Sequence, residues 1–159
     1  MHCLICRVGG RACALPIEHV REVMRRCPIE RVALAPRFTL GVALIRGENV
    51  PVIDAGSLLE GQACSGARFV VLRVADRPGS QRRVALAVDE VVGTERLDPR
   101  ELERVPPWLA AASETVRAMA VLDGRLVEVL ETARLVDAAA GATEPFGKAL
   151  EDEAAKELA

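Results

Sequence analysis

The chain has 159 residues, which is long enough for one domain with a substantial apolar core and leaves little room for a second. Hydrophobic residues make up 50% of the sequence and charged residues 28%, a balance that excludes a largely disordered chain. The formal net charge of -2 provides no attraction to a nucleic-acid backbone, and no apolar run approaches the ~20 residues of a membrane-spanning helix. We therefore expect a cytoplasmic protein with protein partners, no nucleic-acid binding and no direct membrane insertion.

The N-terminal residues predict a β-hairpin. Side chains alternate over residues 3–8, Gly9-Gly10 provides a turn, and a second strand follows over 11–15. Cys3 and Cys6 form a C-x-x-C pair, but their sulfurs point to opposite faces of such a strand and cannot chelate one ion. No second C-x-x-C completes a tetrahedral set, and five cysteines scattered among apolar residues are typical of reduced thiols. We therefore expect no metal site.

Residues 17–25 have an apolar spacing that suits an amphipathic helix. Ile17, Val20 and Met24 recur at intervals of three and four, so periodicity by itself favours a helix here. The segment ends at Cys27-Pro28, because proline restricts the preceding residue and lacks a backbone N–H.

Residues 41–54 predict a tight β-hairpin. Two apolar, β-branched runs, 42–45 and 50–53, flank Arg46-Gly47-Glu48-Asn49, and each strand is expected to be covered on both faces. Gly47 provides the positive φ that a two-residue loop requires. Arg46 is either an ordinary solvated turn charge or a recognition group, because a guanidinium can bind a carboxylate, a carbonyl or an aromatic face.

The middle of the chain predicts a loop followed by a second hairpin. Residues 57–67 are rich in Gly, Ser and Ala and are expected to connect two halves of the domain. A nearly continuous apolar strand covers 69–75, and Pro78-Gly79 turns it. The return strand alternates large side chains with small ones, so another element should pack closely on its small face: Val84, Leu86 and Val88 against Ala85 and Ala87.

The C-terminal third combines short helices with a third hairpin. Asp98-Pro99-Arg100-Glu101 predicts the start of a helix that ends before Pro106-Pro107. The hairpin follows over 116–130 with Asp123-Gly124 as its turn, and helical spacing begins beyond Thr132. Trp108 either plugs the end of a barrel or serves as a docking anchor. Beyond Gly141, Leu150, Ala154 and Leu158 form a weak amphipathic tail.

No group of residues predicts catalysis or a cofactor site. His2 lies at the N-terminus, and His19 is interpreted as a solvated turn residue because no nucleophile is marked nearby. Asp54 and Asp89 each end an apolar strand, as paired carboxylates do, but aspartate at a strand end is also an ordinary turn former. The chain has no P-loop, G-x-S-x-G or G-x-G-x-x-G motif. We expect a non-enzymatic protein of the all-β class, closed or nearly closed into barrels.

Several ordered motifs resemble one known family. Gly41-Val42, Arg46-Gly47 and 50–54 (VPVID) are similar to the central signature of the CheW-like domain, the adaptor fold of bacterial chemosensory arrays. Three other segments resemble the same family in the same order: 15–17 (LPI), 20–23 (VREV) and 87–91 (AVDEV). The resemblance covers about residues 3–137 and implies a short turn and a strand over 20–25 instead of a helix.

The resemblance also implies an architecture. A mainly β fold is expected, with two small five-stranded SH3-like barrel subdomains that share a cleft, short helices and a C-terminal helical tail. The single domain spans residues 1–137, its two barrels meet near 57–67, and 138–159 form the tail.

The implied function is that of an adaptor between the cytoplasmic tip of a methyl-accepting chemoreceptor and the regulatory domain of a CheA-type histidine kinase. The positions that match the receptor groove of the family are Val20, Glu22, Gly41 and Arg46. Val20 is expected to form an apolar floor, Gly41 to permit close backbone approach, and the two charged residues to orient a partner helix. Two alternatives are an adaptor of another chemosensory output, such as pilus-based motility, and a small-ligand-binding β-barrel.

Overall fold

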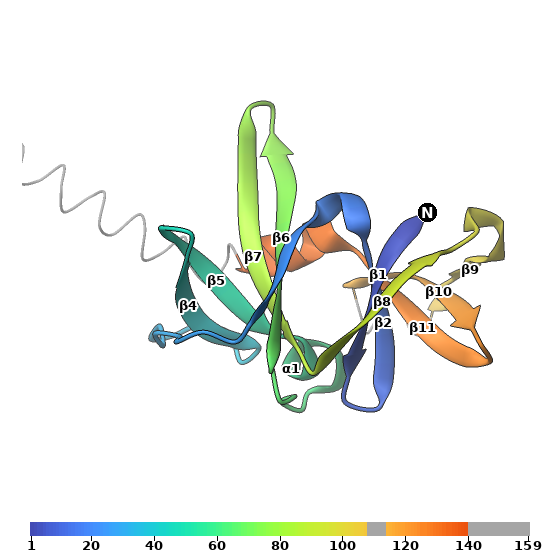
Figure 1. Ribbon diagram of the computed structural model, residues 1–159, viewed down its shortest axis with the longest axis horizontal. Helices are drawn as coiled ribbons and strands as arrows, with labels where there is room; N and C mark the ends of the chain where they lie inside the picture. Colours follow the sequence, from blue (N-terminus) through green and yellow to red (C-terminus); the bar gives the residue numbers. More distant parts are fainter. Residues whose placement is uncertain (108–113, 140–159) are drawn as a thin grey trace, which may run out of the picture.

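The chain forms two β-sheets in the computed structural model, which describes residues 1–107 and 114–139 (Figure 1). Antiparallel pairing joins most neighbouring strands, and parallel pairs join β11 to β2 and β5 to β7. The first sheet has the order β8-β1-β2-β11-β10-β9, with bounds β1 (His2–Val8), β2 (Arg11–Pro16), β8 (Glu90–Arg96), β9 (Glu103–Arg104), β10 (Val116–Leu122) and β11 (Arg125–Leu130). The second has the order β3-β6-β7-β5-β4, with bounds β3 (Val20–Arg25), β4 (Thr39–Ile45), β5 (Glu48–Asp54), β6 (Arg68–Arg77) and β7 (Ser80–Val88).

The mainly β prediction is confirmed, with one change in strand number. The second sheet has the expected five strands, whereas the first has six because the two-residue β9 pairs with β10. Residues 20–25 are strand β3, preceded by the 3₁₀ turn η1 (Ile17–His19), which confirms the turn and strand implied by the resemblance, and the helix that periodicity favours does not form. Hydrogen bonding of β3 to β6 overrides the local spacing.

Each sheet curls around its own apolar interior. The first interior contains Cys3, Ile5, Ala14, Val127 and Val129 among others. The second is built on β4 to β7, and its members are Ala43, Ile45, Val50, Val52, Phe69, Val71, Ala85 and Ala87. Val, Ile, Leu and Ala therefore fill both interiors, as the low aromatic content requires.

A third and larger apolar cluster joins the two sheets. Strand β7 contributes to it with its large side chains, Val84, Leu86 and Val88, while Ala85 and Ala87 face the interior of the second sheet. The expectation that another element packs closely on the small face of this strand is confirmed, because Ala43 and Ile45 of β4, a strand that does not pair with β7, lie in the same cluster as the two alanines. The third cluster makes the two sheets one packed unit.

The prediction that the two barrels meet near residues 57–67 is wrong. Strands β5 and β6, on either side of that segment, belong to the same sheet, and the chain crosses between sheets at η1 and at Asp89. A helix, α1 (Ala55–Glu60), also overlaps the start of this segment, where the Gly and Ser content predicted a loop. The Asp54 side chain caps α1 by accepting from the Gly56 and Ser57 N–H groups, and Gly61 ends it at φ 70°.

The helical prediction beyond Thr132 is confirmed for residues 132–139. Leu135, Val136 and Ala139 pack into the cluster between the sheets, so the packed part of the chain reaches at least residue 139 and not only 137. The predicted tail beyond that point and Trp108 lie outside the described residues. Within the described residues no helix is long and apolar enough to cross a membrane.

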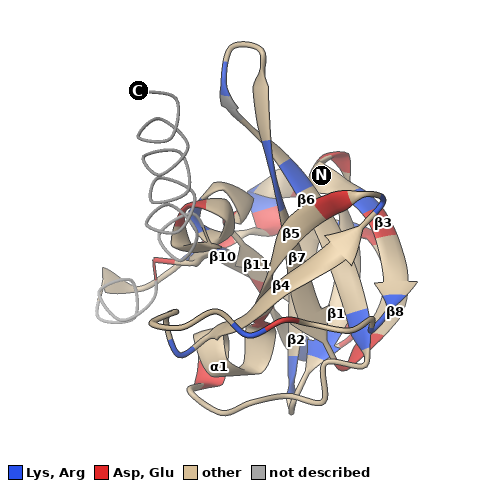
Figure 2. Ribbon diagram, turned by 90° about the vertical axis from the view of Figure 1, so that its left-hand side faces the viewer, with Lys and Arg blue, Asp and Glu red and all other residues tan. Residues whose placement is uncertain are grey.

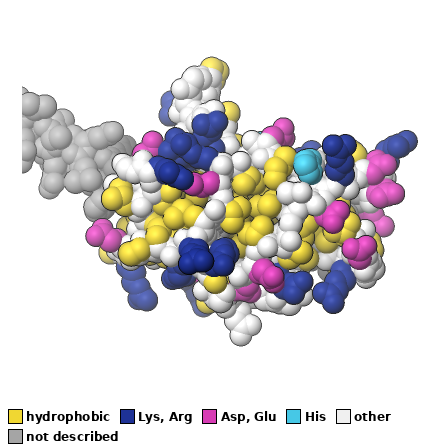
Figure 3. Space-filling model, in the orientation of Figure 1, with side chains coloured by type: hydrophobic (Ala, Val, Ile, Leu, Met, Phe, Trp, Pro, Cys, Tyr) yellow, Lys and Arg dark blue, Asp and Glu magenta, His cyan; other side chains and the backbone are white. Residues whose placement is uncertain are grey.

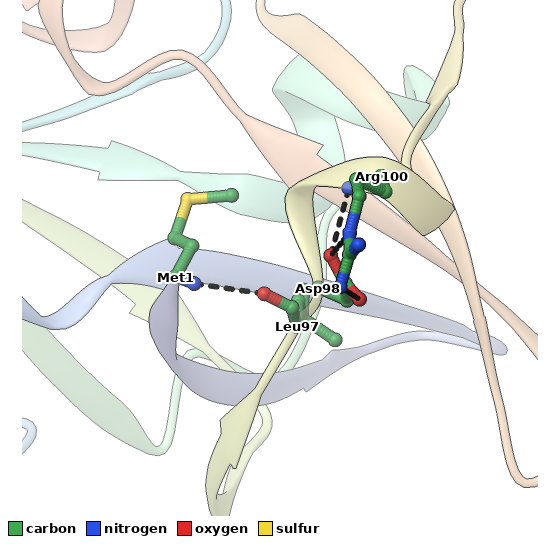
Figure 4. A network of polar contacts seen from close by, with 4 residues as sticks. All are labelled: Met1, Leu97, Asp98 and Arg100. Atoms are coloured by element: carbon green, nitrogen blue, oxygen red, sulfur yellow. Dashed lines mark hydrogen bonds and ion pairs between the residues drawn. The ribbon is translucent and has the colours of Figure 1, made fainter.

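The helix expected over 98–105 is much shorter than predicted. Only η2 (Pro99–Glu101) forms, with the Asp98 side chain accepting from the Arg100 N–H at 2.9 Å (Figure 4). Leu102 has extended backbone angles and packs against the interior of the first sheet, which draws the chain into β9. Met1 and Leu97 hold the preceding segment, because the Met1 ammonium group donates to the Leu97 carbonyl at 2.8 Å and the Leu97 N–H donates to the Met1 carbonyl at 2.7 Å (Figure 4).

The two cysteines of the C-x-x-C pair lie in different apolar clusters. Cys3 belongs to the interior of the first sheet and Cys6 to the cluster between the sheets, which confirms that their sulfurs face opposite sides of β1. Cys6 lies directly opposite Cys13 in the β1–β2 pairing, and the hydrogen bond of the Cys13 thiol to Cys6, together with burial, raises the pKa of Cys13. Both thiols are fully buried.

Candidate partner-binding site

Two of the predicted site residues, Glu22 and Arg46, contact each other directly. Arg46 donates from Nη2 to Glu22 Oε2 at 2.9 Å and from Nε to Glu22 Oε1 at 3.3 Å, in a two-pronged ion pair. The Arg46 side chain remains 69% exposed and that of Glu22 is 21% exposed. The pair therefore links the tip of the β4–β5 hairpin to strand β3 and still presents the guanidinium to a partner.

The turn geometry explains why Arg46 projects from the hairpin. Ile45 pairs with Glu48, so Arg46 and Gly47 form a two-residue loop, and both have positive φ, 53° and 77°. This is the type I′ pattern that matches the twist of the flanking strands. The predicted positive φ of Gly47 is confirmed, and that of Arg46 was not foreseen.

The ion pair keeps Glu22 charged. The hydrogen bond from Arg46 holds the pKa of Glu22 below its usual range; burial opposes this effect, and the positive charge of the guanidinium adds to it. Glu22 is therefore a carboxylate at neutral pH. Glu22 and Arg46, the two charged residues that were expected to orient a partner, are therefore already paired with each other.

Val20 lies two residues from Glu22 on β3 and is half-buried. It packs against the apolar cluster between the two sheets and pairs with Leu72 on β6. The apolar floor expected of Val20 stays a prediction. A second apolar residue, Leu44, is 69% exposed two positions before Arg46. The expectation that β4 is covered on both faces is wrong at Leu44, because β4 is the edge strand of its sheet.

Gly41 has a different role from the one predicted. It is buried, with φ 141°, and the backbone of Glu30 crosses directly over it. A Cβ at this position would lie 1.9 Å from the Glu30 carbonyl oxygen. Glu30 and Val42 exchange two backbone hydrogen bonds of 2.8 Å, and this bridge requires the close approach. Gly41 therefore accommodates a segment of its own chain.

The two strand-ending aspartates are not a catalytic pair. Asp54 is 2% exposed, and its Oδ1 accepts from the N–H groups of Gly56, Ser57 and Cys64. Asp89 accepts from the Gly9 N–H and the Ser65 N–H, each at 2.6 Å. Both carboxylates hold the loop that follows α1, so the turn-former interpretation is correct.

His19 is also structural. Its Nδ1 lies 2.6 Å from Thr132 Oγ1, and the Thr132 side chain is buried at the start of the 132–139 helix. The interpretation of His19 as a solvated turn residue is wrong, because this contact ties η1 to the C-terminal helix across 113 residues of sequence.

Acid should weaken the fold through Asp89. Partial burial acts to raise the pKa of Asp89, but hydrogen bonds from Ser65 and from the Gly9 N–H outweigh it, so the pKa lies below its ordinary value. A depressed folded-state pKa stabilises the protein above the unfolded value of about 4, and this contribution is lost as the pH falls below it. We expect Asp89→Asn to flatten the decline in unfolding free energy between about pH 4 and pH 2.

Denaturant titrations at several pH values measure this effect. Asp123→Asn is the matched control, because Asp123 occupies an exposed hairpin turn with a positive φ that asparagine tolerates. Equal acid sensitivity of wild type and Asp89→Asn would show that Asp89 contributes nothing to the pH dependence.

The fold and the motifs agree with sequence comparison. The family model described as the CheW-like domain matches residues 2–140. The chain belongs to the CheW-like domain family. Two curated relatives of the family are the chemotaxis protein CheW of Rhizobium meliloti, 27% identical over 79% of this chain and 80% of that protein, and the chemotaxis protein CheW of Klebsiella aerogenes, 26% identical over 84% of this chain and 80% of that protein.

A solved CheW-like structure has the same fold. The scaffolding protein TtCheW from Thermoanaerobacter tengcongensis superposes with a TM-score of 0.72 over 82% of this chain and 83% of its own, at 20% identity. The mainly β fold with two sheets is therefore shared with a solved CheW-like protein.

Proposed function

We propose that this protein is a non-enzymatic CheW-like adaptor that couples chemoreceptors to a CheA-type histidine kinase in the cytoplasm. The observation that carries the proposal is the Glu22–Arg46 pair at the hairpin tip, set in a chain that matches the family over residues 2–140. Both curated relatives are named as chemotaxis proteins, and the solved relative is named as a scaffold.

The surface around the ion pair suits a helical partner. Val20 offers apolar area, Arg46 offers a mostly exposed guanidinium, and Leu44 adds an exposed apolar side chain next to it. A partner helix with alternating apolar and acidic positions matches this set, because apolar contacts provide affinity and charges provide orientation.

The packing of the barrels argues against a small-ligand binder. The apolar side chains that line the interior of the second sheet are 0–4% exposed and in mutual contact, so they occupy the space that a ligand in that barrel would need. A packed interior suits a rigid scaffold that works through its outer surface.

Co-elution tests the proposal directly. The purified protein is mixed with the cytoplasmic fragment of a chemoreceptor from the same organism and, separately, with the regulatory domain of its CheA-type kinase, and each mixture is run on a sizing column. We expect a complex in both mixtures and in the ternary mixture. Failure to bind either protein, together with a melting temperature that rises with an apolar small molecule, would favour the ligand-binding alternative.

A further inference from the structure

The β6–β7 hairpin extends beyond the sheet to which it belongs. Strand β3 pairs with β6 only as far as Leu72, and β5 pairs with β7 only from Ala85 onward. Residues 73–83, named here the arm, therefore project as a two-stranded ribbon (Figure 1, Figure 2). A lone two-stranded ribbon is marginally stable in water, so its length points to a use outside the core.

The arm is strongly basic although the whole chain is slightly acidic. It has a single acidic residue, Asp76, and four arginines: Arg73, Arg77, Arg82 and Arg83. Figure 2 shows basic residues on the arm, and Figure 3 shows basic side chains gathered near its base. Arg73 lies directly opposite Arg83 in the strand pairing, an arrangement of like charges that costs stability.

The base of the arm adjoins the candidate site. Arg83 forms an ion pair with Glu48, the residue that follows the Arg46-Gly47 turn. The positive charge of Arg83 also helps to lower the pKa of Glu22, by less than the charges of Arg46 and Arg21 do. Two arginines at this end of the second sheet are thus already paired with glutamates. Arg73 is exposed and forms no hydrogen bond or ion pair within the part of the chain that the structure describes.

We propose that the arm extends the partner-binding surface and that Arg73 binds a carboxylate of an acidic segment on the receptor hairpin. The inference rests on the proposed function and names a contact beyond Val20, Glu22 and Arg46. A carboxylate at Arg73 would relieve its repulsion with Arg83, so the partner would supply the counter-charge that the described residues do not provide. The arm has no aromatic side chain on which a base could stack, which favours a protein partner over a nucleic acid.

Charge reversal separates binding from folding at this position. Arg73→Glu places opposite charges across the strand pair, so we expect an unchanged or higher melting temperature. The same substitution repels an acidic partner, so we expect affinity for the receptor hairpin to fall about tenfold or more. The loss should shrink between about 50 mM and about 500 mM salt, because salt screens exposed charges. A merely structural arginine would not move stability and affinity in opposite directions.

Calorimetric titration of a chemoreceptor tip hairpin from the same organism measures the effect, with Arg104→Glu as the matched control. Arg104 is exposed on β9 of the other sheet, so the same change of charge there should leave affinity within about twofold. Equal affinities of the Arg73→Glu and Arg104→Glu variants would overturn the role of the arm and leave the adaptor function standing. No binding by the wild type would overturn both proposals.

Discussion

Gly41→Ala is expected to lower the unfolding free energy by about 3 kcal/mol or more, the largest loss we expect for any single added methyl group. The new Cβ would lie 1.9 Å from the Glu30 carbonyl oxygen and 2.9 Å from Ile29 Cγ2, and the Glu30 oxygen cannot move away without weakening the hydrogen bond that it accepts from the Val42 N–H. The positive φ of 141° adds backbone strain. Chemical denaturation with both variants, Gly41→Ala and Gly41→Asp, measures the loss.

Gly93→Ala is the matched control for this prediction. Gly93 has a similar φ of 155°, but a Cβ there would meet nothing within 4 Å. The difference between the two variants therefore isolates the clash from the backbone strain. If Gly41→Asp retained wild-type stability and lost only receptor binding, the surface role first expected for Gly41 would be correct and the structural role wrong.

Arg46→Ala is expected to weaken receptor binding about thirtyfold while the melting temperature stays within a few degrees of wild type. The side chain is mostly exposed, so its loss removes little packing, whereas an arginine desolvated by a partner is a typical binding anchor. Arg46→Lys should restore only part of the affinity, because lysine keeps the charge and loses the planar fork. Calorimetric titration with the receptor hairpin measures both variants.

Two further variants control for changes in the turn. Arg46→Asn suits the positive φ of 53° and removes the charge, so it should bind as weakly as Arg46→Ala. Arg125→Ala removes an exposed arginine next to the other two-residue turn, Asp123-Gly124, and should bind like wild type. Wild-type affinity in Arg46→Ala would place the receptor surface elsewhere on the molecule.

Sequence patterns predicted the hairpins well because their signals are local. Gly9-Gly10, Arg46-Gly47, Pro78-Gly79 and Asp123-Gly124 each mark a turn that the structure confirms. Turn residues and period-2 alternation act over a few positions, so neither depends on the rest of the fold. Helix boundaries were predicted less well, since α1 depends on the Asp54 cap and η2 ends where Leu102 reaches the core.

The candidate site was predicted in part. The motifs identified Glu22 and Arg46, but nothing in the sequence indicates that these residues, 24 positions apart, form an ion pair. Leu44 and Arg73 were missed as surface residues, because an apolar edge strand and a projecting arm cannot be recognised before the strand order is known.

The sequence by itself determined the mainly β class, the positions of the tight turns and membership of the CheW-like family, because each depends on residue type and short spacing. The resemblance to the family already implied the strand over 20–25 against its helical spacing, and the pairing of β3 with β6 confirms it. Only the tertiary structure decided that 57–67 stays within one sheet. It also decided that Gly41 faces the backbone of Glu30, and not a partner. These features depend on which distant segments lie side by side, and long-range pairing and burial override the local preference there.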